Sequence, residues 1–489
     1  MSVRERISTG VRAMLAANLV NVLANGLLIL VLTRVLLDPE GYGRLNFALS
    51  VFGVVAIFAT LGLPKSTARY VNEYLEQDAS QIRFLIRRSL LYVGIVTAVV
   101  VAAILVLGEP VARYAGEPAI VPFLVVGAVY VAVRSVTKYL SAVFQGFNQV
   151  QWTAALNSIS GVGRLLGVIV LVALGFGAVG ALAGYVLGFV AAGVVGAVVL
   201  YTRNYRPASG TSDPDDSLSR RLLRYSVPLT ATRGANVLDK KVDTVLVGLL
   251  LNMTAVGYYA VAKQLSDFVA VPAASFGFTI SPAIGQEKAG DSLDRARTLY
   301  TRSLSYVILA YVPAAVGIVL VARPGIRFVF GEQYLPAVPV VQVFSGFVLV
   351  NAINKVTSDG LDFLGLARMR AIVKSLMAVS NFLLNLLLIP AIGVVGAAVA
   401  TVVTYTVYTG TNVYLIHREL SIPPTAVLRP LALTCLIAAG MGGAVFLALP
   451  LVSGPFTLVG VVALGVGIWA VLALASGVVD PQDVASLLA

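Results

Sequence analysis

Eight basic side chains lie inside long apolar stretches of the sequence, where a charge is costly and usually serves a function. They are Arg134, Lys138, Arg164, Arg233, Lys240, Lys241, Lys263 and Lys355. Arginine can bind phosphate oxygens through two parallel N–H bonds and lysine supplies a point charge, and both act more strongly where water is scarce. The set therefore predicts a cationic cavity that receives an anionic group.

Acidic side chains in the same stretches are fewer. They are Asp239, Asp243, Asp267 and Asp359. The first three are candidates for binding a coupling proton or sodium ion. Local charge pairing is the structural alternative, because Lys263 stands four residues before Asp267 and would share its helical face. The same spacing separates Lys355 from Asp359.

Five asparagines in apolar stretches could form hydrogen bonds with a polar substrate. They are Asn21, Asn25, Asn236, Asn351 and Asn354. Asparagine in a membrane helix also forms hydrogen bonds to neighbouring helices, so a purely structural role is the alternative.

The elements that position these residues are membrane-spanning helices. Hydrophobic residues make up 58% of the 489 residues and charged residues only 12%, a composition that no water-soluble fold can bury. The apolar blocks have roughly the 20-residue length that crosses a bilayer. We expect fourteen spans, near residues 13–37, 42–63, 89–107, 119–145, 152–174, 176–201, 226–251, 256–281, 303–322, 336–358, 371–389, 393–416, 430–450 and 455–477.

Positive charge in the loops predicts the orientation of these spans. With both termini placed in the cytoplasm, the inner segments hold 22 Lys and Arg residues and the outer ones hold 5. This bias explains the net charge of +12 without nucleic acid as a partner. The predicted location is the plasma or inner cell membrane, with multiple spans.

An internal repeat becomes visible when the sequence is compared with itself about 215 residues along. NVL, GY, RSL-YV and G-VGA motifs recur at offsets of 215, 216, 214 and 216. Six spans separate equivalent positions, so the copies should be parallel. The expected fold is all-α and polytopic, with two six-helix lobes and two further C-terminal helices. The expected divisions are an N-terminal lobe at 1–202, a cytoplasmic linker at 203–225, a C-terminal lobe at 226–417, and the last two spans with a short tail at 418–489.

Four segments carry a family resemblance. They are DPEGYGRLNFA at 38–48, AVFQGFNQ at 142–149, VDTVLVGLLLNMTAVGYYAVAKQL at 242–265 and NLLLIPAIGVVGAAVAT at 385–401. In order and spacing the chain resembles the polysaccharide transporters, including the O-antigen flippases, of the multidrug/oligosaccharidyl-lipid/polysaccharide exporter superfamily. The resemblance implies a flippase for a polyprenyl (undecaprenyl- or dolichyl-type) phosphate- or diphosphate-linked oligosaccharide, which it moves from the cytoplasmic to the outer leaflet by alternating access. The transported molecule would serve cell-surface polysaccharide or glycan biosynthesis. For such a substrate, the cationic cavity would receive the phosphate or diphosphate, and the five asparagines are candidates for contacts with the glycan.

Other function classes fit the sequence less well. A cation-coupled exporter of the multidrug and toxic compound extrusion type is the main alternative, but its organic cations would favour an acidic cavity. An enzyme acting on the same lipid carriers would need catalytic acids on a large outer loop, and the expected outer loops are short. The single His417 and Cys435 argue against metal or thiolate sites, and the chain lacks a phosphate-binding loop for ATP. We expect no catalytic residues, cofactor or metal; the expected partners are the lipid-linked oligosaccharide, membrane lipid and a proton or sodium counter-ion.

Overall fold

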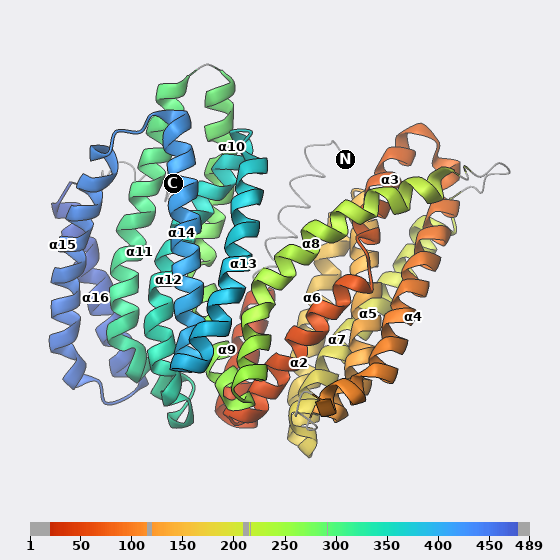
Figure 1. Cartoon of the computed structure of the whole chain (residues 1–489), viewed down its shortest axis with the longest axis horizontal. Coiled ribbons are helices and arrows are strands. Elements are labelled where there is room, and N and C mark those ends of the chain that lie inside the picture. Colours follow the sequence, from red (N-terminus) through yellow and green to blue (C-terminus); the bar gives the residue numbers. More distant parts are fainter. Residues whose placement is uncertain (1–19, 115–119, 209–214, 216, 291, 478–489) are drawn as a thin grey trace. The chain divides into compact units, whose positions relative to one another are not determined.

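The computed structural model describes residues 20–477 except for residues 115–119, 209–214, 216 and 291. Every regular element in this part of the chain is a helix (Figure 1). The chain divides into two compact units, Met1–Leu249 and Leu250–Ala489. The expected all-α membrane fold is therefore confirmed, and each unit is considered below by itself.

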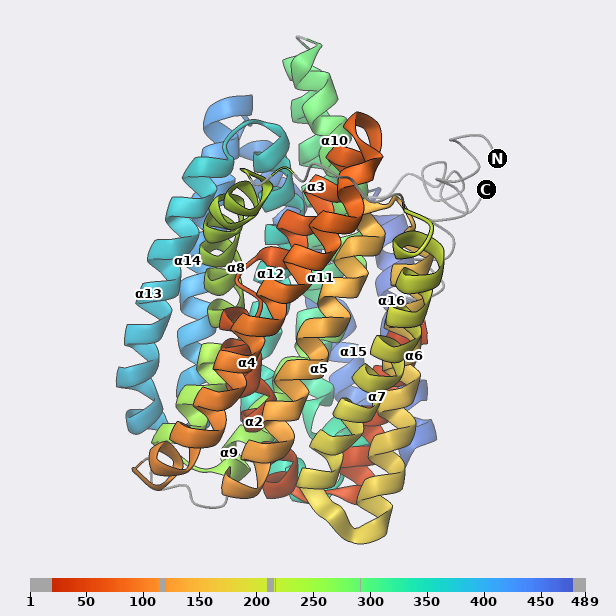
Figure 2. The same ribbon diagram turned by 90° about the vertical axis from the view of Figure 1, so that its right-hand side faces the viewer.

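In the described residues, the first unit contains the helix Val20–Leu36 and seven further α-helices. They are α2 (Pro39–Phe58), α3 (Leu63–Gln77), α4 (Ile82–Tyr114), α5 (Val121–Gly146), α6 (Val150–Leu171), α7 (Gly177–Val199) and α8 (Ser217–Leu250). Helix α7 continues as a π-helix over Leu200–Tyr205. Helices α3, α4 and α5 pack against one another (Figure 2). Their buried face includes Tyr139, whose hydroxyl forms a 2.7 Å hydrogen bond with that of Ser89.

The described part of the second unit contains eight α-helices. They are α9 (Met253–Val269), α10 (Val271–Ala289), α11 (Leu293–Val329), α12 (Val338–Phe363), α13 (Ala367–Ile392), α14 (Val394–Leu420), α15 (Thr425–Ala448) and α16 (Pro455–Ala475). The last two helices pack on α11, where the Trp469 indole N–H donates to the Leu309 carbonyl at 2.9 Å. The α11–α12 contact is closed by a 3.1 Å hydrogen bond between the Tyr300 and Thr357 hydroxyls.

The internal repeat extends to backbone conformation. Asp38 caps α2 by accepting from the Gly41 N–H at 2.9 Å, and Asn252, 214 residues later, caps α9 in the same way at 2.9 Å. Gly177 is the first residue of α7 and Gly393, 216 residues later, is the N-cap of α14; their φ values are 53° and 66°. A side chain would be strained there, which explains why glycine occupies both positions. The two copies therefore share their caps and turns as well as their sequence motifs.

The expected count of fourteen membrane spans is not confirmed. By length and composition, the described residues hold ten helices able to cross a membrane, or eleven if the bent pair α9–α10 is one span. This count takes the glycine-hinged α6–α7 stretch, Val150–Tyr205, as one element and does not include the charged α8. The helix Val20–Leu36 is too short to be counted, and the residues before it lie outside the described part.

The expected linker at 203–225 is partly helical. Residues 217–225 form the first turns of α8, while residues 209–214 and 216 lie outside the described part. Helix α8 lies along α3: the Ser66 hydroxyl donates to the Leu222 carbonyl at 2.9 Å. At the α2–α3 bend, a Cβ on Gly62 would come within 2.5 Å of the Ser226 carbonyl oxygen. Glycine thus permits this close approach, and the lobe boundaries and the cytoplasmic side of the linker stay predictions.

Candidate functional site

Arg164 on α6 is the most constrained of the predicted basic residues. Its Nη2 donates to the Asn25 Oδ1 at 2.5 Å, and its Cζ lies 4.9 Å from the centroid of the Tyr185 ring on α7. Its Nε is buried and has no hydrogen-bond partner among the described residues. The Arg164 guanidinium is therefore held by Asn25 and Tyr185, while its Nε–H donor makes no hydrogen bond with the described residues.

Helix α7 can approach Arg164 because glycines face α6. A Cβ on Gly188 would lie 2.7 Å from the backbone nitrogen of Arg164, and one on Gly184 would lie 2.3 Å from that of Val168. Larger residues could not maintain this spacing. The close approach explains why Tyr185, which lies between these glycines, reaches the Arg164 side chain.

Arg134 on α5 lies in the same unit and contacts a tyrosine one turn earlier. Its Nη1 donates to the Tyr130 hydroxyl at 2.9 Å, and a Cβ on Gly53 of α2 would be 3.7 Å from that nitrogen. The Tyr130 ring also lies edge-on to the ring of Phe189 on α7, with the two centroids 5.7 Å apart. Each arginine thus contacts a tyrosine, and these aromatic contacts connect both arginines to α7. We call Asn25, Tyr130, Arg134, Arg164 and Tyr185 the arginine–tyrosine cluster.

The cluster has an uncompensated positive charge. Within the described residues, no carboxylate lies within 4.0 Å of Arg134 or Arg164, both of which are half-buried. Three other arginines are paired with acids: the half-buried Arg44 with Glu40 at 2.5 Å, and the exposed Arg113 and Arg327 with Glu109 at 2.5 Å and Glu332 at 2.8 Å, respectively. Two guanidinium groups without acids in a partly dry site favour an anionic ligand.

Four charged residues of α8, namely Asp239, Lys240, Lys241 and Asp243, differ in how far they are buried. Asp243 is only 2% exposed, Asp239 and Lys241 are half-buried, and Lys240 is exposed. All four have interaction partners. Arg233 and Asn236 belong to the same helix, but their side chains lie outside the described part of the chain. Whether this patch shares a cavity with the arginine–tyrosine cluster stays a prediction.

The remaining predicted residues are distributed over both units. Lys138 is half-buried on α5, and in the second unit Lys355 is half-buried on α12. The Lys263 Nζ lies 5.5 Å from the centroid of the Tyr259 ring on α9, four residues before the exposed Asp267. None of these three lysines belongs to the arginine–tyrosine cluster.

The asparagines fall into two groups. Asn25 holds Arg164, and Asn21 lies against α6, where a Cβ on Gly161 would come within 2.3 Å of its Oδ1. In the second unit Asn354 accepts from the Asn412 amide at 3.0 Å, which joins α12 to α14. Asn351 is 8% exposed on α12. Asn354 thus joins two helices, as the structural alternative expects, and its contact with a glycan stays a prediction.

Sequence reasoning missed both tyrosines of the cluster. Tyr130 could have been found from its spacing, because it precedes Arg134 by four residues and shares its helical face. Tyr185 had no local signal, since only the packing of α7 on α6 brings it to Arg164.

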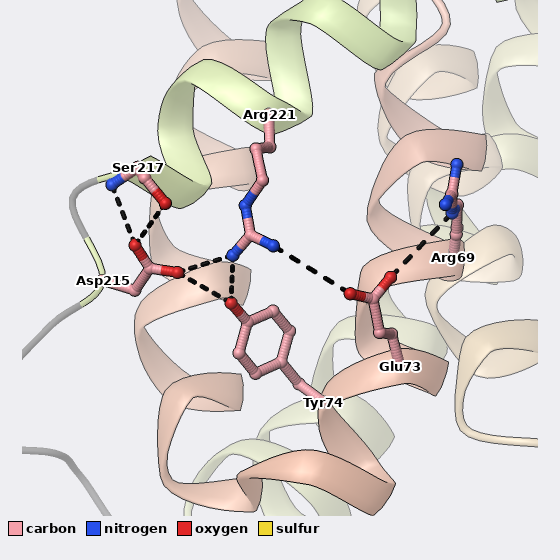
Figure 3. A network of polar contacts seen from close by, with 6 residues as sticks. All are labelled: Arg69, Glu73, Tyr74, Asp215, Ser217 and Arg221. Atoms are coloured by element: carbon pink, nitrogen blue, oxygen red, sulfur yellow. Dashed lines mark hydrogen bonds and ion pairs between the residues drawn. The ribbon is translucent and has the colours of Figure 1, made fainter.

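A second polar network joins α3 to the start of α8 (Figure 3). Asp215 accepts from the Tyr74 hydroxyl at 2.8 Å, from the Arg221 Nη2 at 2.5 Å, and from the backbone N–H and hydroxyl of Ser217 at 3.0 and 2.5 Å. Arg221 also donates to Tyr74 and lies 4.0 Å from Glu73. We call these five residues the α3–α8 clamp. The Ser217 hydroxyl, followed by that of Tyr74, lowers the pKa of Asp215 below its ordinary value of 3.8.

The sequence matches the model of a known protein family. Residues 8–288, more than half of the 489 residues, match the family described as polysaccharide biosynthesis protein. A probable low-salt glycan biosynthesis flippase of Haloferax volcanii is 22% identical over 373 residues, which are 76% of each chain. AglR, a probable flippase of the same organism, is 32% identical over 168 residues, which are 34% of this chain and 35% of that relative.

Two solved structures show the same fold. The lipid II flippase MurJ in an inward closed conformation has a TM-score of 0.75 at 14% identity, over 95% of this chain and 98% of that one. A multidrug resistance MATE family transporter in an inward-facing conformation has a TM-score of 0.63 at 16% identity, over 82% of this chain and 94% of that one. These likenesses concern the fold alone.

Proposed function

We propose a transport cycle for this chain, which belongs to the polysaccharide biosynthesis protein family. The chain is a multi-pass membrane transporter, not an enzyme, and its relatives and fold support flipping of a lipid-linked glycan. The proposed substrate is a polyprenyl phosphate- or diphosphate-linked oligosaccharide. The proposed path leads from the cytoplasmic to the outer leaflet of the cell membrane by alternating access, for the synthesis of surface glycans.

The arginine–tyrosine cluster carries this proposal. The linkage phosphate is the part of such a substrate that is most costly to move away from water. Arg134 and Arg164 lack a carboxylate partner among the described residues, and the buried Nε of Arg164 has no hydrogen bond. A phosphate would supply the missing negative charge and acceptors in an environment of low dielectric constant, where the attraction is strong.

The tyrosines and the asparagine prepare the cluster for this ligand. The Tyr185 ring and the Asn25 amide hold the Arg164 guanidinium in place, and the Tyr130 hydroxyl holds that of Arg134. Less side-chain entropy is then lost when the anion binds. A guanidinium group held in place can also bind phosphate through two parallel N–H bonds, which a mobile lysine would not reproduce.

An ion-coupled exporter of organic cations is the competing proposal, and the MATE family likeness is its support. The α8 acids Asp239 and Asp243 would be its coupling site, and the same acids would couple a flippase to a proton or sodium gradient. The uncompensated positive charge of the cluster favours an anionic over a cationic substrate. A lipid-linked glycan is therefore the better-supported cargo.

Transport by reconstituted protein tests the proposal. In proteoliposomes containing a fluorescent lipid-linked oligosaccharide, Arg164→Ala should lower the initial flipping rate by roughly 10- to 100-fold, the effect of losing a hydrogen bond to a charged group. Arg164→Lys should retain part of the rate. The control is Arg113→Ala, because Arg113 is exposed and paired with Glu109. Wild-type flipping by an Arg164→Ala, Arg134→Ala double variant of normal abundance would exclude the cluster, and saturable export of an organic cation would favour the competing function.

A further inference from the structure

Three arginines at one end of the first unit lie over aromatic rings. The rings belong to Phe84, Trp152 and Tyr205, which all pack against the same buried core cluster. The guanidinium carbons of Arg83, Arg88 and Arg203 lie 5.0, 5.3 and 5.0 Å from the ring centroids of Tyr205, Phe84 and Trp152, in that order. We call these six residues the arginine–aromatic rim. Cation–π contact fixes each arginine while its N–H groups stay available at the ring face.

These arginines differ from the acid-paired arginines of the same protein. Arg83, Arg88 and Arg203 are exposed, and no carboxylate of the described chain lies within 4.0 Å of them. Aromatic rings attract a cation but do not neutralise its charge. The rim therefore carries three positive charges that no carboxylate of the described chain neutralises, and such a surface favours an anionic ligand.

The rim lies where apolar helix surfaces end. Arg83 and Arg88 stand in the first two turns of α4, and Arg203 lies in the π-helix that ends α7. Immediately beyond them, apolar side chains on both helices are exposed: Leu91 and Ile95 on α4 are 49% and 52% exposed, and Val194 and Val198 on α7 are 58% and 56% exposed. Tryptophan and tyrosine also favour the headgroup level of a bilayer. The surface thus combines sites for a charged headgroup and for acyl chains.

We propose that the arginine–aromatic rim binds the phosphate headgroup of an anionic phospholipid of the surrounding bilayer. The phosphate lies against the guanidinium N–H groups, and the acyl chains cover the exposed apolar residues of α4 and α7. A free phosphate would contact only the arginines and leave the apolar residues of α4 and α7 uncovered, which is why a lipid is the better occupant. The bound lipid links the start of α4 to the end of α7, which already touch through Arg83 and Tyr205. This site is separate from the arginine–tyrosine cluster and does not depend on the transported substrate.

Lipid titration of the purified full-length protein tests the rim. Detergent-solubilised protein is titrated with phosphatidylglycerol or phosphatidylcholine, and bound lipid is counted by native mass spectrometry alongside the thermal unfolding midpoint. The rim variant carries Arg83→Gln, Arg88→Gln and Arg203→Gln. The control variant carries Arg44→Gln, Arg113→Gln and Arg327→Gln, which removes the same total charge from arginines paired with acids.

Wild type and the control variant should retain phosphatidylglycerol and unfold at a higher temperature with it, whereas phosphatidylcholine should have little effect. The rim variant should bind phosphatidylglycerol roughly 100-fold more weakly, about 5-fold for each arginine lost. Arg203→Gln alone should weaken binding about 5-fold, which keeps the test usable if the triple variant does not fold.

Three outcomes would overturn the proposal. Equal lipid retention by the rim and control variants would show that only overall charge matters. Equal stabilisation by inorganic phosphate would replace the lipid by a free anion. Displacement of phosphatidylglycerol from the rim by a lipid-linked oligosaccharide, one for one, would make the rim a substrate site instead. None of these results requires transport, so they leave the proposed flippase function to its own test.

Discussion

The α3–α8 clamp offers a quantitative test of how the start of α8 is held. Asp215→Ala removes the acceptor for Ser217, the hydrogen bond from Tyr74 and the ion pair with Arg221 (Figure 3). A lost helix cap costs about 1 kcal/mol. The pair with Arg221 is screened by solvent, because its side chains are 31% and 40% exposed, and so contributes about 0.5 kcal/mol. With the Tyr74 bond at about 0.5–1 kcal/mol, local opening of α8 should become easier by about 2 kcal/mol.

Hydrogen exchange followed by mass spectrometry measures this opening directly. A change of about 2 kcal/mol predicts roughly 30-fold faster exchange of the amides in residues 217–226 in the Asp215→Ala variant. Asp215→Asn keeps the cap oxygen but loses the charge, so its exchange should accelerate only about 2- to 5-fold. Glu109→Gln, which breaks an exposed pair on α4, is the matched control and should leave these amides unchanged.

The pH dependence gives a second check on the same residue. The folded-state pKa of Asp215 lies below its ordinary value of 3.8, chiefly because the Ser217 hydroxyl donates to it. Its contribution is therefore complete above the unfolded-state pKa and disappears as the pH falls through the folded-state value. The difference in exchange between wild type and Asp215→Asn should be constant from neutral pH to about pH 5 and vanish in stronger acid. Equal exchange in wild type, Asp215→Asn and Asp215→Ala at neutral pH would refute the clamp.

Three further predictions concern orientation, coupling and packing. A cysteine replacing Ser219 on a Cys435→Ala background should react with impermeant maleimide only from the cytoplasmic side, and labelling from outside intact cells would reject the topology. If α8 binds the coupling ion, Asp243→Asn should abolish the response of flipping to an imposed gradient and spare equilibration without one; a wild type indifferent to proton and sodium gradients would contradict this. Gly188→Ala places a Cβ 2.5 Å from the Ser160 carbonyl oxygen. It should lower the free energy of unfolding in detergent by about 1–3 kcal/mol and slow flipping. Wild-type stability and flipping in this variant would show that α7 can shift to accommodate the methyl group.

Much of the architecture follows from local sequence. Apolar composition requires helices in a bilayer, because only helices and closed barrels satisfy every backbone hydrogen bond there. The repeat was visible in motifs, and its glycines and caps recur with the same geometry in both copies, as at Gly177 and Gly393. The basic residues that could bind an anion were also identifiable, since a charge in an apolar run is unusual wherever the chain folds.

Helix counting shows where sequence patterns become ambiguous. Hydropathy indicates apolar length, but it does not indicate where a helix bends or whether a charged helix crosses the membrane. The 41° bend between α9 and α10 and the charged α8 are both of this kind. Fourteen expected spans therefore correspond to ten or eleven helices that meet the criterion of length and apolarity in the described part of the chain.

The composition of the site was decided by tertiary structure. Sequence placed Arg134 and Arg164 on different helices and, with Lys240, near the middle of their expected spans. Packing on glycines brings α7 close enough to α6 for Tyr185 to contact Arg164, and Tyr130, whose ring contacts Phe189 of α7, accepts the hydrogen bond from Arg134. Charge and hydrophobicity are properties of single residues and can be read along the chain, whereas the partners of a charge depend on contacts between distant helices. The sequence therefore identified the cations, and only the fold showed that Arg134 and Arg164 each contact a tyrosine and have no acid within reach among the described residues.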